Sequence, residues 1–198
     1  MGKRAAGHGF MPSKIVFPGG RVERSDGFAP AATPLHQDTS ATLGRHLRQR
    51  RAHAVAAAAI RETFEETGLM LARPLMLVRP MRPARAPKGW GSFTASGLGA
   101  DFGALRLTAR AITPPYHHKR FDAWFFMARA DHLVDLPHHE ASGELEELVW
   151  LGFDEALASD IPRITAIMLS EVQNRLRAPD AAVPWYSMPR GKHRRDWL

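Results

Sequence analysis

The sequence contains no cysteine. Disulfide bonds, thiol nucleophiles and cysteine-ligated zinc sites are therefore excluded. No apolar run reaches the 18 residues that would predict a transmembrane helix. The opening residues 1–4 lack the apolar stretch of a secretory signal, and Ala6 stands where a myristoylation signal requires serine or threonine. These absences favour a cytoplasmic protein with no membrane partner.

Internal repeats and low-complexity tracts are also missing, and 198 residues suffice for one domain with a substantial core. The 27 basic and 20 acidic residues give a net charge of +7, which favours anionic partners. The basic residues are dispersed and form no aromatic-interleaved platform. We expect the densest basic run, residues 190–195, to lie in a solvated tail. A small polyanion is therefore the expected partner, rather than nucleic acid.

The most informative segment is Arg61–Leu69, which follows the alanine-rich run 54–59. It predicts the last turns of a helix, with Gly68 ending it in a left-handed cap. Positions i, i+3 and i+4 share one helix face, and here all three are acidic: Glu62, Glu65 and Glu66. Carboxylate oxygens suit hard divalent ions, which predicts metal-assisted attack on a phosphate ester or anhydride. The alternative is a solvated acidic face in which Arg61 pairs with Glu65.

A second motif, residues 16–20 with the sequence Val-Phe-Pro-Gly-Gly, precedes this helix. Together the two segments resemble the Nudix box of the Nudix hydrolases. The resemblance implies an α+β fold, an α/β/α sandwich with a mixed sheet between helices. It also implies that Mg²⁺ or Mn²⁺ is held by the Gly20 carbonyl and by Glu62, Glu65 and Glu66. Glu65 would be catalytic, and Arg61 would orient a carboxylate.

The sequence departs from the family pattern in two ways. Asp26, not glutamate, follows Gly20 after five residues, and 34 residues instead of seven separate Asp26 from Arg61, an excess of 27. We expect the insertion, residues 27–52, to form a surface loop followed by a helical extension. An insertion at this place resembles the coenzyme A diphosphatase branch, which implies hydrolysis of coenzyme A or an acyl-CoA. ADP-ribose, NADH, a dinucleoside polyphosphate, or a non-catalytic nucleotide- or RNA-binding role are the alternatives.

Other candidate residues lie outside the box. A general base could come from the acidic residues in or near the loop before the strand at 145–151. The candidates are Glu140, Glu144, Glu146 and Glu147, of which Glu144 is preferred. Alternatively, a metal-bound hydroxide held by Glu65 suffices without a further base. Two basic loops could contact the substrate phosphates: Arg79, Arg82 and Lys88 in one, and His118, Lys119 and Arg120 in the other. We expect Trp90 and Phe93 to pack in the core.

Hydrophobic patterning predicts strands at 14–17, 69–78, 105–112, 121–130 and 145–151, and helices at 154–158 and 161–177. We assign residues 1–178 to a single domain and 179–198 to a C-terminal tail. Little sequence precedes residue 4 to supply the family's first strand, so we expect that the chain starts late or that the sheet lacks an edge strand. A missing edge exposes backbone groups and favours a homodimer.

Overall fold

The computed structural model describes residues 1–4, 13–76, 86–114, 116, 120–134 and 145–198. The helices are α1 (Gln37–His46), α2 (Gln49–Thr67), α3 (Gly91–Ala95), α4 (Phe153–Ala158) and α5 (Arg163–Arg177), and the short 3-10 helices are η1 (Ser25–Phe28), η3 (Phe102–Ala104), η4 (Ala130–His132) and η5 (Pro189–Gly191). The strands are β1 (Gly2–Arg4), β2 (Ile15–Val16), β3 (Ala31–Thr33), β4 (Met70–Pro74), β5 (Leu98–Asp101), β6 (Arg106–Ile112), β7 (Asp122–Met127), β8 (Leu133–Val134), β9 (Leu145–Leu148), β10 (Pro184–Ser187) and β11 (Arg194–Trp197).

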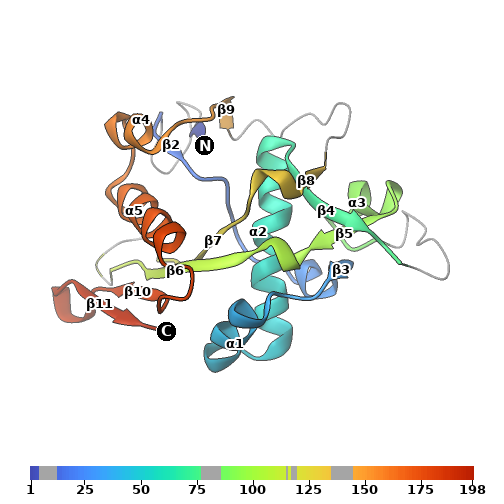
Figure 1. Cartoon of the computed structure of the whole chain (residues 1–198), viewed down its shortest axis with the longest axis horizontal. Helices are drawn as coiled ribbons and strands as arrows, with labels where there is room; N and C mark the ends of the chain where they lie inside the picture. Colours follow the sequence, from blue (N-terminus) through green and yellow to red (C-terminus); the bar gives the residue numbers. More distant parts are fainter. Residues whose placement is uncertain (5–12, 77–85, 115, 117–119, 135–144) are drawn as a thin grey trace.

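The strands form three small sheets with the orders β2-β1-β9, β11-β10-β6-β7 and β3-β5-β4-β8. Two pairings, β10 with β6 and β3 with β5, are parallel and the others are antiparallel, so the sheets are mixed. β6 contacts both α1 and α5, while β7 contacts α2. Figure 1 shows α2 running through the middle of the molecule, with α5 on the other side of the β6–β7 pair. The predicted α+β class, with mixed strands between helices, is confirmed.

Helix α2 is the element on which the acidic residues stand. Its middle is alanine-rich and almost fully buried from Ala54 to Ala58, because small side chains let it lie close to the sheets. The helix ends at Gly68, whose φ of 74° places it in the left-handed region and whose N–H bonds to the Phe64 carbonyl. The predicted helix end and glycine cap are therefore confirmed.

The main core cluster joins α2, β4, β5 and the segment around α3. Trp90 and Phe93 are both fully buried in it, with ring centroids 4.9 Å apart, and Phe93 meets Phe64 edge-on. The expectation that these two aromatic residues pack in the core is confirmed. Their burial fixes the loop before α3 against α2.

The insertion at residues 27–52 differs from the predicted surface loop. It forms the end of η1, β3, all of α1 and the start of α2, and its residues Ala29, Thr39 and Leu43 are buried. Leu43 anchors a second core cluster with Ala52, Leu107 and Val183. The loop part of the prediction was wrong because a stretch broken by proline and glycine still carried enough apolar side chains to bury one helix face. The predicted helical extension into the acidic helix is confirmed, since α2 begins at Gln49.

Both ends of the chain also differ from expectation. Residues 2–4 form β1, which pairs with β2 on one side and β9 on the other, so the strand that the sequence left in doubt is present. Residues 179–198, expected to be a tail, contain the β10–β11 hairpin, and β10 extends the sheet beside β6. No helix in the described parts of the chain is long and apolar enough to cross a bilayer.

Two glycines test the importance of the α2 cap. Replacing Gly68 by alanine forces a side chain into a left-handed conformation and should lower the free energy of unfolding by about 1 kcal/mol. Gly44 is the matched control, because it lies in α1 with open space around the position of a new Cβ atom. Gly44→Ala should instead raise stability by about 0.5 kcal/mol or more. Urea denaturation of both variants measures the free energy of unfolding, which should fall for Gly68→Ala and rise for Gly44→Ala. Equal changes in the two variants would contradict the assigned role of the cap.

Candidate active site

A buried ion pair joins the two halves of the acidic motif. Arg61 in α2 is 3% exposed and Asp26 in η1 is fully buried. The Arg61 Nε and Nη2 atoms donate to the two Asp26 carboxylate oxygens at 2.8 and 3.1 Å. Nη2 also donates to the Arg21 carbonyl at 2.9 Å. This fork-to-fork geometry fixes the loop after Gly20 against the helix, across 35 residues of sequence.

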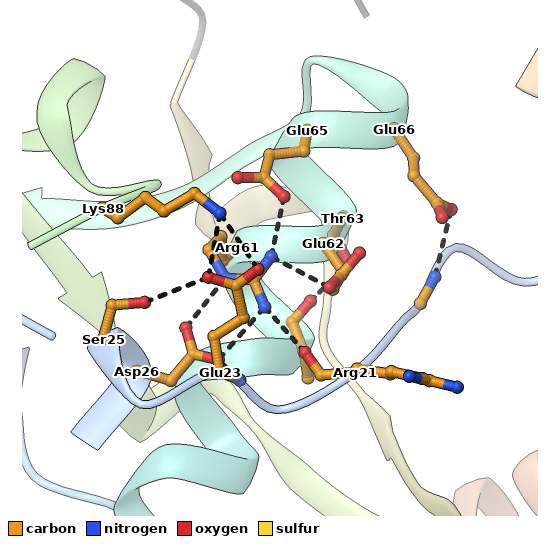
Figure 2. Close-up of polar contacts among 12 residues, drawn as sticks. Arg21, Glu23, Ser25, Asp26, Arg61, Glu62, Thr63, Glu65, Glu66 and Lys88 are labelled. Atoms are coloured by element: carbon orange, nitrogen blue, oxygen red, sulfur yellow. Dashed lines mark hydrogen bonds and ion pairs between the residues drawn. The ribbon is translucent and has the colours of Figure 1, made fainter. Parts of the chain in front are cut away.

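The remaining guanidinium nitrogen of Arg61 holds two of the helix carboxylates. Nη1 donates to Glu65 at 2.7 Å and forms an ion pair with Glu62 at 2.9 Å (Figure 2). Burial alone would lower the pKa of Arg61, but the Asp26 hydrogen bond and the charges of Glu62, Asp26 and Glu65 raise it far above its usual value. Arg61 is therefore a permanent cation at the centre of an acidic cluster.

The third carboxylate, Glu66, turns to a different partner. Glu66 is 3% exposed, and its Oε2 atom accepts a hydrogen bond from the Gly19 N–H at 3.1 Å. Gly20 lies equally close to the helix, because a Cβ atom at this position would overlap the Glu62 carboxyl group. The Pro-Gly-Gly loop thus touches two of the three acidic side chains, and a side chain at position 20 would force the Glu62 carboxyl group to move.

The three carboxylates do not converge on one point as the helix periodicity predicted. Within the described residues, no group of three histidine, cysteine, aspartate or glutamate side chains is placed to hold a metal ion. Arg61 draws Glu62 and Glu65 together, whereas Glu66 lies toward the loop (Figure 2). The difference arises because Arg61 supplies the positive charge between the first two carboxylates. Chemically the donors still suit Mg²⁺ or Mn²⁺, since every one is an oxygen.

A second loop, at residues 88–90, borders the cluster and contacts a carboxylate of the first loop that the sequence patterns did not single out. Glu23, three residues before Asp26, lies 3.4 Å from the Lys88 ammonium group. Next to Lys88, Gly89 has a φ of 82° and approaches Arg61 and Glu65 so closely that a side chain would collide with them. Trp90 follows, and its indole N–H points to Asp26 at 3.4 Å. The only sequence signal for Glu23 was its place in the same loop.

The other predicted site residues divide into two groups. Lys88 borders the cluster, while Arg120 is exposed just before β7. Glu146 and Glu147 are exposed on β9. The remaining predicted residues lie outside the described part of the chain: Arg79, Arg82, His118, Lys119, Glu140 and Glu144.

The Asp26–Arg61 pair should contribute strongly to stability because it is buried. Asp26→Asn leaves the Arg61 cation without its bidentate partner and should lower the free energy of unfolding by about 3 kcal/mol. Asp122 is the matched control: it also holds an arginine, Arg110, through two bonds of 2.8 Å, but its side chain is 46% exposed. Asp122→Asn should cost less than about 1 kcal/mol. Chemical denaturation measures both changes, and equal losses would refute the importance of burial.

Comparison with known proteins agrees with this geometry. No protein-family model and no curated protein matches the chain. A solved structure, the crystal structure of a Nudix hydrolase from Alicyclobacillus acidocaldarius, matches with a TM-score of 0.61 and 27% sequence identity, covering 85% of this chain and 80% of that one. The fold, the paired Pro-Gly-Gly and Arg-Glu motifs and the similarity to this Nudix hydrolase together support a Nudix pyrophosphohydrolase.

Proposed function

We propose that this protein hydrolyses the diphosphate bond of a nucleoside diphosphate derivative, namely coenzyme A or an acyl-CoA. The products would be 3′,5′-ADP and a phosphopantetheine. One observation carries the proposal: α2 presents Glu62, Glu65 and Glu66 within two turns, against the backbone of Gly19 and Gly20. Such a concentration of oxygen donors beside a glycine loop suits a divalent cation and a phosphate-bearing substrate.

The metal ligands in this proposal are Glu62, Glu65, Glu66 and the Gly20 carbonyl. Mg²⁺ or Mn²⁺ bound there would neutralise the diphosphate and acidify a bound water. Of the two carboxylates held by Arg61, Glu65 has the more accessible side chain, 38% exposed against 15% for Glu62. We therefore assign to Glu65 the acceptance of the proton from the attacking water, and Glu144 remains a proposed alternative base.

Arg61 acts on the reaction through the carboxylates. Its contact with Glu65 fixes the direction of that side chain, and Asp26 in turn fixes Arg61. Arg61 itself is buried, so direct contact with substrate is not its role. The proposed phosphate contacts come from the exposed cations Lys88 and Arg120. The other proposed contacts are the basic residues of the two loops, Arg79, Arg82, His118 and Lys119.

The coenzyme A assignment rests on the resemblance of the insertion inside the box to that branch of the family. Hydrolysis of ADP-ribose, NADH or a dinucleoside polyphosphate is the second candidate, since the carboxylate cluster would serve any diphosphate. A non-catalytic nucleotide-binding role is disfavoured by the presence of all three acidic residues with the arginine that holds two of them.

A hydrolysis screen tests the reaction and the substrate. We expect Mg²⁺- or Mn²⁺-dependent release of 3′,5′-ADP from coenzyme A or acetyl-CoA, with slower turnover of ADP-ribose, NADH and diadenosine polyphosphates. Glu65→Gln should lower kcat by about 10²- to 10⁴-fold, because it removes the proton acceptor. Asp154→Asn, the same carboxylate-to-amide change on the exposed face of α4, should leave kcat unchanged.

Chromatographic separation of the products identifies the bond that breaks. Absence of turnover with every diphosphate would overturn the proposed reaction. Turnover of ADP-ribose without turnover of coenzyme A would overturn the substrate while leaving the reaction class intact. Equal activity of the two variants would remove Glu65 from the catalytic group.

A further inference from the structure

The end of α5 and the β10–β11 hairpin line an open cavity of about 310 Å³. Its polar and aromatic lining comes mainly from six residues: Glu171, Asn174, Arg175, Arg177, Arg195 and Trp197. None of them belongs to α2 or to the Pro-Gly-Gly loop. Figure 1 shows the hairpin and α5 together at one side of the molecule, with the chain end beside them.

The lining carries an excess of positive charge. Three arginines face a single carboxylate, Glu171, which is 7% exposed. Glu171 accepts hydrogen bonds from the Tyr186 hydroxyl, from Arg195 at 2.8 Å and from the Asn174 amide at 3.2 Å. The Glu171 carboxylate is therefore balanced by neighbouring side chains of the protein itself. Burial and the Glu171 hydrogen bond together raise the pKa of Tyr186 to about 12, so this hydroxyl remains a donor.

The arginines are not equivalent. Arg175 donates to the carbonyls of Pro179 and Ala181 and so shapes the turn that follows α5. Arg195 is divided between Glu171 and the aromatic residues of the hairpin. Arg177 is exposed at the end of α5. Among the described residues it makes no hydrogen bond or ion pair, so its charge is available to an anion.

An aromatic surface adjoins these cations. Trp197 is 56% exposed, which is unusual for so large an apolar side chain. The Arg195 guanidinium lies 4.5 Å from the centre of its ring and 5.8 Å from that of Tyr186. An indole face beside guanidinium groups is the combination that stacks a nucleobase while its phosphate is neutralised.

We propose that this cavity is a second binding site, which takes a nucleotide phosphate on Arg177 and Arg195 and the attached base on Trp197. The ligand is a nucleoside monophosphate unit, either free or within a single-stranded nucleic acid. The volume of the cavity suits one nucleoside monophosphate, because it is at the lower end of the range for small-molecule sites. The site differs from the carboxylate cluster in chemistry, because it binds phosphate through arginine and requires no metal.

Binding measurements on the full chain in EDTA test this site apart from hydrolysis. The probes are AMP, a fluorescein-labelled oligo(U) of about 15 nucleotides, and inorganic phosphate, measured by calorimetry and fluorescence anisotropy. We expect AMP or the oligonucleotide to bind more tightly than phosphate, with affinity falling as salt rises. Tighter binding of the oligonucleotide than of AMP would identify the single strand as the source, and the reverse order would identify the free nucleotide.

Variants with matched controls locate the site. Trp197→Ala and Arg177→Glu should each weaken binding by about tenfold or more. Trp150→Ala removes another exposed tryptophan, and Arg163→Glu makes the same charge reversal at the opposite end of α5, so neither should change the affinity. Glu65→Gln should also bind normally, which separates this site from the proposed catalytic one. Absence of binding, phosphate binding as tightly as AMP, or loss in only one of the two site variants would overturn the proposal.

Discussion

The contact between Asp26 and Arg61 determines how the rest of the acidic site is arranged. It joins a loop and a helix that are separated by 34 residues of sequence, and both partners are withdrawn from water. Desolvating two charges is costly, so such a pair persists only where the geometry is good and every remaining donor is satisfied. Here the Arg61 donors reach Asp26, Glu62, Glu65 and the Arg21 carbonyl. The positions of Glu62 and Glu65 follow from this arrangement, because both are directed toward a guanidinium that cannot move independently.

The insertion shows why sequence distance matters little for this contact. Lengthening a connection adds a loop-closure cost that grows only with the logarithm of its length. The insertion also buries Ala29, Thr39 and Leu43, and the Thr39 hydroxyl bonds to the Leu105 carbonyl and accepts the Leu107 N–H. It is therefore held against β6 by its own packing. Asp26, just before the insertion, remains beside Arg61 because η1 packs against α2.

The sequence predicted local features better than long-range ones. The end of α2, its glycine cap and the strand at residues 106–112 depend on neighbouring residues and periodicity, and they were found. The directions of Glu62 and Glu66 were not, because they depend on contacts with Arg61 and with the Gly19 N–H, which helical spacing does not reveal. The sequence instead predicted a C-terminal tail at residues 179–198, with the basic run 190–195 in solvent. Their strands depend on pairing with β6 and on the Glu171–Arg195 contact, neither of which leaves a local pattern.

The shared guanidinium also bears on how the proposed metal site could operate. In the structure, Arg61 contacts Asp26, Glu62 and Glu65 together. If Glu62 and Glu65 turned to a divalent cation, Arg61 would lose its Nη1 contacts but keep both bonds to Asp26 and the one to Arg21. The buried guanidinium would therefore stay neutralised in either arrangement. Without Asp26, Arg61 would have to keep its contacts with Glu62 and Glu65, because losing them would leave its buried charge unpaired. Asp26 would thus allow Glu62 and Glu65 to leave the Arg61 guanidinium and bind a divalent metal ion.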